Sequence, residues 1–249
     1  MKKISLREKS ILAGLYLSKF DAAGLRQLGF RSFIEAFNVI GFALGVQPGS
    51  IKNYRDEFDP LFPNDRKGWH KRPMRHYCEV IYDNYAKLEL DEFSVLLKQL
   101  IYKRQDVDTL IEEVEKEDGN KKSSFAQRLI TGQAAEQYFL SKYKEIELFK
   151  DFEIEDTTKL GCGFDFKLTS QDLFYGVEVK GMNEAKGSIS LTNKEYSMAS
   201  LMGDRYFLFV VRNFKETPFH NLYLNPLGGE LSFNRVEQKI IQVSWLAKL

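Results

Sequence analysis

The sequence predicts an α+β or α/β protein, with a helical domain first and a domain built on a mixed central sheet after it. In the first half, apolar residues recur at the spacing of helices. The second half is predicted as helix, three strands, helix and strand, an order typical of α/β domains. Between the halves the composition turns acidic and then polar, which indicates a linker. We therefore expect domains at residues 1–118 and 119–249.

The composition excludes several classes of protein. A chain of 249 residues is long enough for two small domains or one large one. A net charge of +1 means that nucleic-acid binding must depend on where the charges lie. Two cysteines cannot form a disulfide framework, and three scattered histidines argue against structural zinc. No long apolar run follows the first residues, so we expect a cytoplasmic protein without a signal peptide or a membrane span.

Helical spacing and turn residues divide the first half into short helices. These are predicted over residues 5–20, 33–44, 51–58, 74–87 and 92–104, with a solvated helix running into the linker over residues 106–120. Ser50 is the expected N-cap of the third helix, because it ends a turn that contains Pro48 and Gly49. We expect the outward face of that helix to carry Lys52, Asn53 and Arg55.

The second and third helices have the spacing of a helix-turn-helix, which favours DNA binding. Lys52 suits a phosphate contact, while Asn53 and Arg55 could contact base edges. A basic segment with one aromatic residue follows and suits phosphate contacts; it contains Arg66, Lys67, Trp69, Lys71, Arg72 and Arg75. The alternative is a purely structural helical domain, because any helical bundle contains such turns.

Strand-like runs dominate the second half after one long helix. We expect that helix over residues 123–143, and strands over residues 146–154, 163–168, 173–180 and 205–211. Thr192 and Glu195 form a capping box, which should open a further helix that ends at Gly203. The run from Tyr206 to Val211 is continuously apolar, as in a strand covered on both faces.

Two of these strands carry acidic and basic side chains. Strand alternation places Asp165 on the face opposite Phe164 and Phe166, and it places Glu178 and Lys180 together on one face. If the strands are neighbours, two carboxylates and an ammonium can converge. The set suits Mg²⁺-assisted phosphodiester hydrolysis, in which carboxylates hold the metal and a lysine stabilises negative charge. The alternative is a salt-bridged surface strand.

The chain here resembles the PD-(D/E)XK nuclease superfamily, which has the restriction-endonuclease-like fold, and in particular a branch common in bacterial defence proteins. The resemblance covers about residues 127–211 and rests on a helix with Gly132 and Glu136, Gly163-Phe164-Asp165, Val177-Glu178-Val179-Lys180-Gly181 and Leu191-Thr192-Asn193-Lys194-Glu195. It implies that Asp165 and Glu178 bind Mg²⁺, with Mn²⁺ as a substitute, and that Lys180 assists catalysis. Phe164 stands where the family has proline.

Further candidates lie around this trio. Glu136 falls on the helix face expected to meet the sheet and is a candidate fourth catalytic residue, with Gly132 allowing close approach; the alternative is a carboxylate satisfied by a structural partner. Candidates to contact DNA beside the site are Lys186, Ser188, Ser190, Asn193 and Lys194. A polar β-hairpin would look the same, and for Thr192 and Glu195 helix capping is the favoured interpretation.

The function that these features predict is a sequence-specific double-stranded DNA endonuclease of the type II restriction kind. The helical domain would find the site and the second domain would cut it. We expect a homodimer on DNA, because a duplex has two strands of opposite polarity. Interface candidates are Phe219, Leu222, Tyr223 and Trp245, although core packing is the favoured role for most of them. The alternatives are a non-catalytic DNA-binding subunit of a larger defence complex and a structure-specific or repair nuclease.

Overall fold

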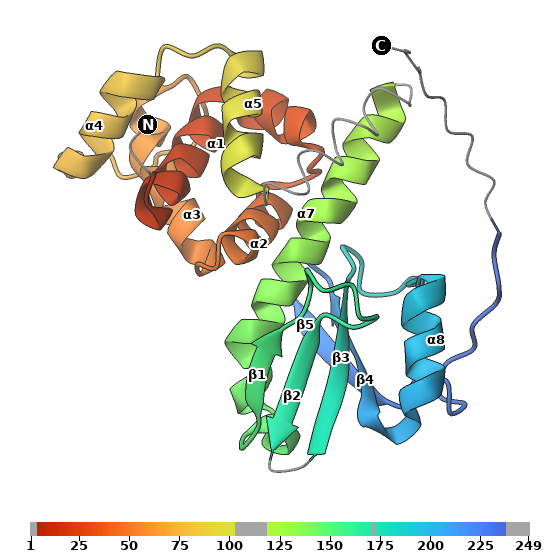
Figure 1. Cartoon of the computed structure of the whole chain (residues 1–249). Helices are drawn as coiled ribbons and strands as arrows, with labels where there is room; N and C mark the ends of the chain where they lie inside the picture. Colours follow the sequence, from red (N-terminus) through yellow and green to blue (C-terminus); the bar gives the residue numbers. More distant parts are fainter. Residues whose placement is uncertain (1–3, 103–118, 171–172, 238–249) are drawn as a thin grey trace, which may run out of the picture.

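The computed structural model describes residues 4–102, 119–170 and 173–237, and within residues 119–126 the backbone alone. The predicted fold class is confirmed, because a helical region precedes a mixed five-stranded sheet with helices packed on it (Figure 1). The described α-helices are α1 Leu6–Leu28, α2 Phe33–Ala43, α3 Pro48–Phe58, α4 His76–Tyr85, α5 Leu90–Ile101, α7 Gly119–Lys142 and α8 Asn193–Met202. The strands are β1 Glu153–Asp156, β2 Phe166–Ser170, β3 Leu173–Gly181, β4 Tyr206–Arg212 and β5 Phe219–Leu224. Short 3-10 helices lie at Asp59–Leu61, Tyr143–Glu145, Glu147–Phe149 and Gly203–Arg205.

Capping residues fix where the first helices begin. The Ser5 hydroxyl accepts the backbone N–H of Glu8 at 3.3 Å and opens α1 through a capping box. The prediction that Ser50 caps the third helix is wrong, since α3 begins at Pro48 and Gln47 is its N-cap. Proline suits the first helical turn because its missing N–H would have no partner there. The expected solvated helix over residues 106–120 lies largely outside the described residues.

The sheet has the order β1-β2-β3-β4-β5, in which β3 and β4 are parallel and the other neighbours are antiparallel. The helix α8 connects the two parallel strands. Alternate residues of β4 enter two apolar clusters: Phe207 and Phe209 pack in the core that includes α7, whereas Leu208 and Val210 pack with Met182 on the opposite face. The continuously apolar run of β4 is therefore covered on both faces, as predicted.

The long helix α7 joins the helical region to the sheet (Figure 1). The side-chain amide of Gln133 on α7 donates to the carbonyls of Ala43 at 2.8 Å and Ile101 at 3.1 Å. Asn38 on α2 donates to the carbonyls of Phe214 and Glu216, both at 2.7 Å. Buried polar groups are costly without partners, so these bonds fix the two regions against each other. The expected division at residues 118/119 stays a prediction.

Two predicted strands begin later than expected. Of residues 146–154, only the end from Glu153 is strand, because the chain turns through 3-10 helices that bury Phe149 against Phe207, with ring centroids 5.0 Å apart. β2 begins at Phe166 after a turn in which Gly163 has φ +94°. Phe164 consequently packs in the cluster of α8 and does not share a face with Phe166, contrary to the prediction.

The strand β5 was not predicted, and it contains three of the proposed interface residues. Phe219 is exposed, Leu222 packs against the main core, and the hydroxyl of Tyr223 accepts a hydrogen bond from Arg212 at 2.9 Å. Trp245 lies outside the described residues. Among the helices that the structure describes, none has the length and apolar character needed to cross a membrane.

Candidate active site

The strand β3 positions two of the predicted catalytic residues, and the start of β2 positions the third. Because β2 runs antiparallel to β3, its first residue lies opposite Val177, and Asp165 comes directly before it. The Asp165 N–H donates to the carbonyl of Val177 at 3.0 Å, and the Val179 N–H donates to Asp165 Oδ2 at 2.8 Å. These bonds hold the Asp165 carboxylate beside Glu178.

Lys180 is held between two carboxylates. Its Nζ lies 2.6 Å from Glu178 Oε1 and 2.7 Å from Glu195 Oε2. Glu178 is only 3% exposed, so the alternative of a salt-bridged surface strand is wrong. Glu195 belongs to α8, where its carboxylate also accepts the backbone N–H of Thr192 at 2.9 Å. The predicted capping box is confirmed, but the sequence did not reveal the ion pair of Glu195 with Lys180.

Asp165, Glu178 and Lys180 lie close together in a buried environment, and both burial and the neighbouring charges shift their pKa values. Burial raises the pKa of Asp165, and the charge of Glu136 raises it further. Burial also raises the pKa of Glu178, with the charge of Asp165 as the next cause. Burial lowers the pKa of Lys180, but Glu178 and Glu195 outweigh it and the pKa is raised. Carboxylates that repel one another in a pocket are typical of sites that take up a cation.

A cavity of about 460 Å³ opens beside these residues, between α7, the end of β3 and the segment that leads into α8. Asp165, Glu178, Lys180 and Glu195 line it. From α7 it is lined by Gln127, Arg128, Thr131, Gly132 and Glu136, so the prediction that Glu136 faces the same site is confirmed. From the other side it is lined by Asn183, Ser188, Ile189 and Ser190.

The cavity contains residues that the sequence reasoning missed. Arg128, Gly132 and Glu136 recur every four residues and form one stripe of α7, so the helical period could have identified Arg128. Ser188 and Ser190 reach the cavity as predicted. Of the other groove candidates, the exposed Lys186, Asn193 and Lys194 do not belong to the described lining.

The prediction that Gly132 allows close helix approach is wrong. A Cβ atom at Gly132 would have no neighbour within 4 Å, because this residue faces the cavity. The close approach occurs instead at Gly181, where a Cβ would lie 2.7 Å from the carbonyl oxygen of Thr131 on α7. A glycine is therefore needed where β3 ends against the helix.

The donor set fits Mg²⁺. Among the described residues no group of three or more His, Cys, Asp or Glu side chains is placed to hold a metal ion. Mg²⁺ does not need such a cage, since it commonly takes one or two carboxylates and completes its shell with water and substrate phosphate. Asp165 and Glu178 supply two buried carboxylates beside a solvent-accessible cavity, which is a suitable arrangement for that ion.

Residues 135–224 match the family model described as Protein NO VEIN, C-terminal. The matched segment is 90 of the 249 residues and so covers less than half of the chain. It begins near the end of α7 and ends with β5, and it contains Glu136, Asp165, Glu178, Lys180 and Glu195. Searches of curated proteins and of solved structures found no match.

The predicted DNA-contacting residues of the helical region lie outside the matched segment and divide into two groups. Lys52 and Asn53 are exposed on α3, but Arg55 is only 8% exposed. The prediction that Arg55 faces outward is wrong, because it follows Ile51 by four residues and therefore shares its inward face. The Arg55 guanidinium lies 4.8 Å from the ring centroid of Phe33 and pairs with Asp56 at 2.6 Å.

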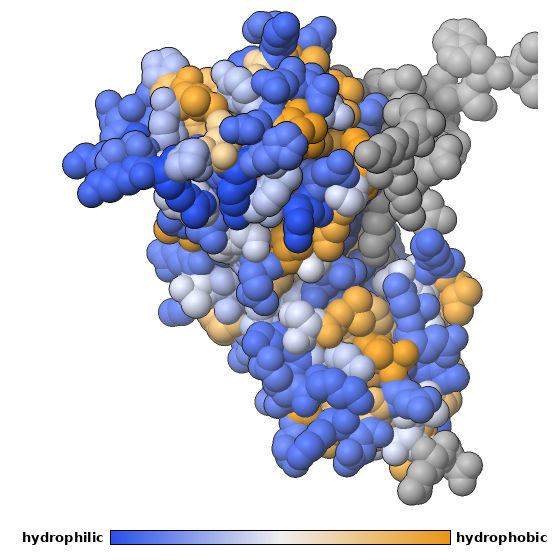
Figure 2. Space-filling model, turned by 90° about the vertical axis from the view of Figure 1, so that its left-hand side faces the viewer, coloured by the Kyte–Doolittle hydropathy of each residue, from blue (hydrophilic) through white to orange (hydrophobic). Residues whose placement is uncertain are grey.

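The basic segment after α3 likewise contains anchors and exposed residues. Arg66 donates two hydrogen bonds to the buried Asp59, both at 2.9 Å, and Arg75 is hydrogen-bonded to the buried Glu57. Arg72 lies 3.6 Å over the ring centroid of the half-buried Trp69. The exposed basic and histidine side chains are Lys67, His70, Lys71 and Arg72. This side of the helical region is mostly hydrophilic (Figure 2).

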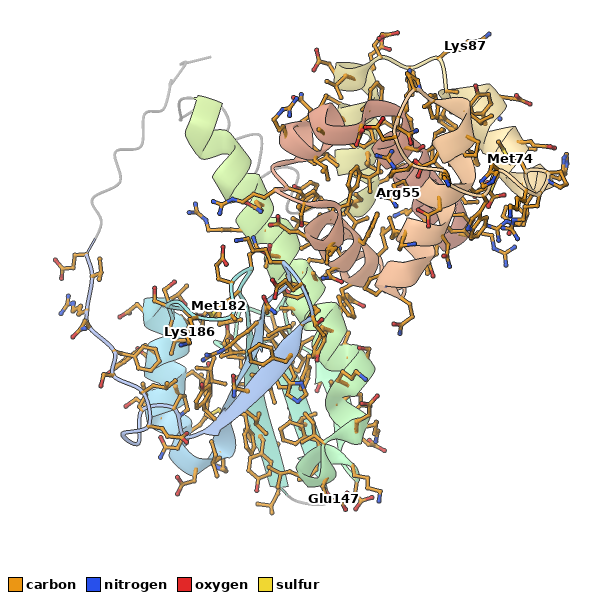
Figure 3. All side chains as sticks on the ribbon, turned by 180° about the vertical axis from the view of Figure 1, so that it is seen from behind. Arg55, Met74, Lys87, Glu147, Met182 and Lys186 are labelled. Carbon is orange, nitrogen blue, oxygen red and sulfur yellow. The ribbon has the colours of Figure 1, made fainter. Side chains whose placement is uncertain are left out.

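The exposed basic segment and the cavity occupy different parts of the molecule. In Figure 3, Met74 marks the end of the basic segment at the edge of the helical region, whereas Met182 and Lys186 lie beside α8. The structure thus brings Asp165, Glu178, Lys180 and Glu136 together, whereas no residue of the basic segment belongs to the described lining of the cavity.

Proposed function

We propose that this chain is a Mg²⁺-dependent nuclease of the PD-(D/E)XK type that cuts double-stranded DNA. The observation that carries the proposal is the convergence of Asp165, Glu178 and Lys180 on one cavity of about 460 Å³. Asp165 lies directly before β2 and the other two lie on β3, so the three residues meet through the antiparallel pairing of β2 and β3. The combination of a carboxylate pair and an adjacent ammonium suits phosphodiester hydrolysis.

Asp165 and Glu178 would hold the metal, and Mn²⁺ would substitute for Mg²⁺. The metal, when bound, supplies an acidified water and neutralises charge on the phosphate. Lys180 donates hydrogen bonds from its ammonium and stabilises the negative charge that develops as water adds to phosphorus and one P–O bond breaks. Glu136 borders the same cavity and would orient a water molecule there.

DNA would be held by two groups of residues. Beside the cavity, Arg128, Ser188 and Ser190 supply a guanidinium and hydroxyls suited to the phosphates that flank the scissile one. In the helical region, Lys52 and Asn53 remain exposed candidates, with the exposed segment of Lys67, His70, Lys71 and Arg72 nearby in the sequence. We extend the proposal to sequence-specific cutting of the type II restriction kind by a homodimer on DNA, in the cytoplasm.

The test is digestion of a long unmodified duplex with Mg²⁺, followed by sequencing of the ends. Asp165→Ala, Glu178→Ala and Lys180→Ala should each abolish cleavage and leave DNA binding largely intact. Ca²⁺ should support binding without turnover, since it takes similar oxygen ligands with looser geometry. Duplexes that contain nicks, flaps or junctions are digested in parallel. One short cut sequence in the plain duplex supports the restriction-type proposal, whereas cutting only at nicks, flaps or junctions indicates a repair nuclease. Binding without cutting indicates a non-catalytic subunit, and neither binding nor cutting refutes all three.

A further inference from the structure

We propose that Glu195 is a positioning residue that keeps the Lys180 ammonium at the cavity when Glu178 is engaged by a metal ion. The inference rests on the proposed nuclease function and deepens it. The ammonium of Lys180 has three N–H donors. In the structure one carboxylate partner is Glu178, a proposed metal ligand, and the other is Glu195, at 2.7 Å. Of the two partners, only Glu178 would bind the metal ion during catalysis.

Glu178 alone is a poor anchor for Lys180. It sits two residues earlier on the same strand, and its Oε1 is the atom that contacts the ammonium. A divalent cation on the Glu178 carboxylate would compete for that oxygen and repel the ammonium, since like charges a few ångströms apart in a buried site interact strongly. Without a second partner, Lys180 would be pushed from its place as the metal bound.

Glu195 is held in place independently of the metal site. Its Oε2 accepts the Thr192 N–H at 2.9 Å, and its own N–H donates to the Thr192 hydroxyl at 3.3 Å. This capping box belongs to the first turn of α8, so the carboxylate is fixed by the helix that carries it. The side chain of Glu195 is only 17% exposed, and the side chain of Lys180 is 21% exposed.

The helix α8 is itself fixed against the turn that leads to Asp165. A Cβ at Gly163 would lie 2.9 Å from the Cβ of Met198, so the turn and the helix are in close contact. The hydroxyl of Tyr206 donates to the carbonyl of Gly163 at 2.9 Å and fastens the same turn to β4. One rigid helix therefore sets the positions of both Lys180 and the segment that ends in Asp165.

Glu195→Gln separates the two roles of the residue, which are to cap α8 and to pair with Lys180. Glutamine also completes a capping box, so the substitution keeps the cap on α8 and removes the charge that holds Lys180. Ser200→Gly is the matched control, because Ser200 is exposed on the same helix and glycine weakens a helix without touching the cavity. The control should lower Tm by about 1–2 °C and leave cleavage unchanged.

The experiment measures kcat and KM for cleavage and, separately, the labelling rate of Lys180. We expect Glu195→Gln to lower kcat by roughly 10- to 100-fold with little change in KM for DNA, as for a misplaced catalytic group. Labelling of Lys180 by an amine-reactive reagent, read by mass spectrometry on the full chain with Mg²⁺ and without DNA, should become several-fold faster in this variant alone.

Wild-type kcat in Glu195→Gln, or an equal loss of kcat in Ser200→Gly, would overturn the positioning role. So would an unchanged labelling rate of Lys180. A wild-type chain that cuts no DNA would overturn the proposed nuclease function instead, and the labelling rate would still decide whether Glu195 holds Lys180.

Discussion

Gly132 offers a substitution that should stabilise the fold and abolish the proposed activity at once. The residue lies in α7 one turn before Glu136, where it lines the cavity and a Cβ would have no neighbour within 4 Å. Glycine in a helix costs about 0.8–1 kcal/mol relative to alanine, and leucine is nearly as good a helix former as alanine. Gly132→Leu should therefore raise the free energy of unfolding by about 0.5–1 kcal/mol, which corresponds to a rise in Tm of roughly 1–4 °C.

The leucine side chain would stand in the cavity of about 460 Å³ that contains Asp165, Glu178 and Lys180. A phosphodiester could then not reach these residues in the required geometry, and a displacement of about 1 Å is enough to reduce the rate roughly 100-fold. We expect Gly132→Leu to lose cleavage by at least that factor, and Gly132→Ala to gain stability with a smaller loss.

The assays are denaturant or thermal unfolding together with cleavage of a duplex that the wild-type chain cuts. Gly181→Ala is the matched contrast, because a Cβ there would lie 2.7 Å from the Thr131 carbonyl oxygen. Overpacking of this kind typically costs about 1–3 kcal/mol. A Gly132→Leu variant that is less stable than the wild-type chain would show that the position has no free space for a side chain. A stable variant with wild-type cleavage would show that the substrate does not enter this cavity.

Three further predictions concern the metal, the basic segment and the oligomer. Mg²⁺ should raise the Tm of the wild-type chain but not of Asp165→Asn, because only the ionised carboxylate binds the ion, and a similar rise in both would exclude Asp165 as a ligand. Replacing Lys67, Lys71 and Arg72 together with alanine should weaken DNA binding at all sequences and flatten its salt dependence. Arg66→Ala should instead lower the free energy of unfolding by roughly 2–3 kcal/mol, because buried Asp59 loses two hydrogen bonds. The mass of the protein on a duplex in Ca²⁺ should be that of two chains, and one chain per duplex with a nicked plasmid intermediate would contradict the dimer.

Local patterns predicted the parts of the site that depend on neighbours in sequence. Alternation along a strand placed Glu178 and Lys180 on one face, and the spacing of Thr192 and Glu195 predicted the start of α8. The helical period placed Glu136 toward the sheet, and this residue lines the cavity. Each of these inferences needs only the geometry of a single element.

The failures depend on side-chain partners in other elements or on a backbone turn that no periodicity reveals. Arg55 is buried because Phe33 and Phe37 of α2 cover its guanidinium at about 5 Å, and a cation over aromatic rings is stabilised there. Phe164 changes sides because the left-handed backbone of Gly163 turns the chain just before β2. The ion pair of Glu195 joins α8 to β3, and no spacing rule within either element predicts it.

The rigid attachment of the helical region bears on how binding and cutting are coupled. A flexible linker would let a DNA-binding domain sample many positions relative to the cavity, but Asn38 and Gln133 make buried hydrogen bonds that join the helices to the sheet. The exposed segment that ends beside Met74 therefore has one fixed position relative to the cavity, and in Figure 3 Met74 lies far from Met182 at the other region of the molecule. A duplex held by that segment must run along the molecule to reach the cavity, or the DNA in the cavity must be gripped by a second copy of the chain. In the first case the distance from the binding segment to the cut is set by the packing of α7 against α2, and not by the length of the segment that connects α5 to α7. In the second case it is set by how the two copies pair.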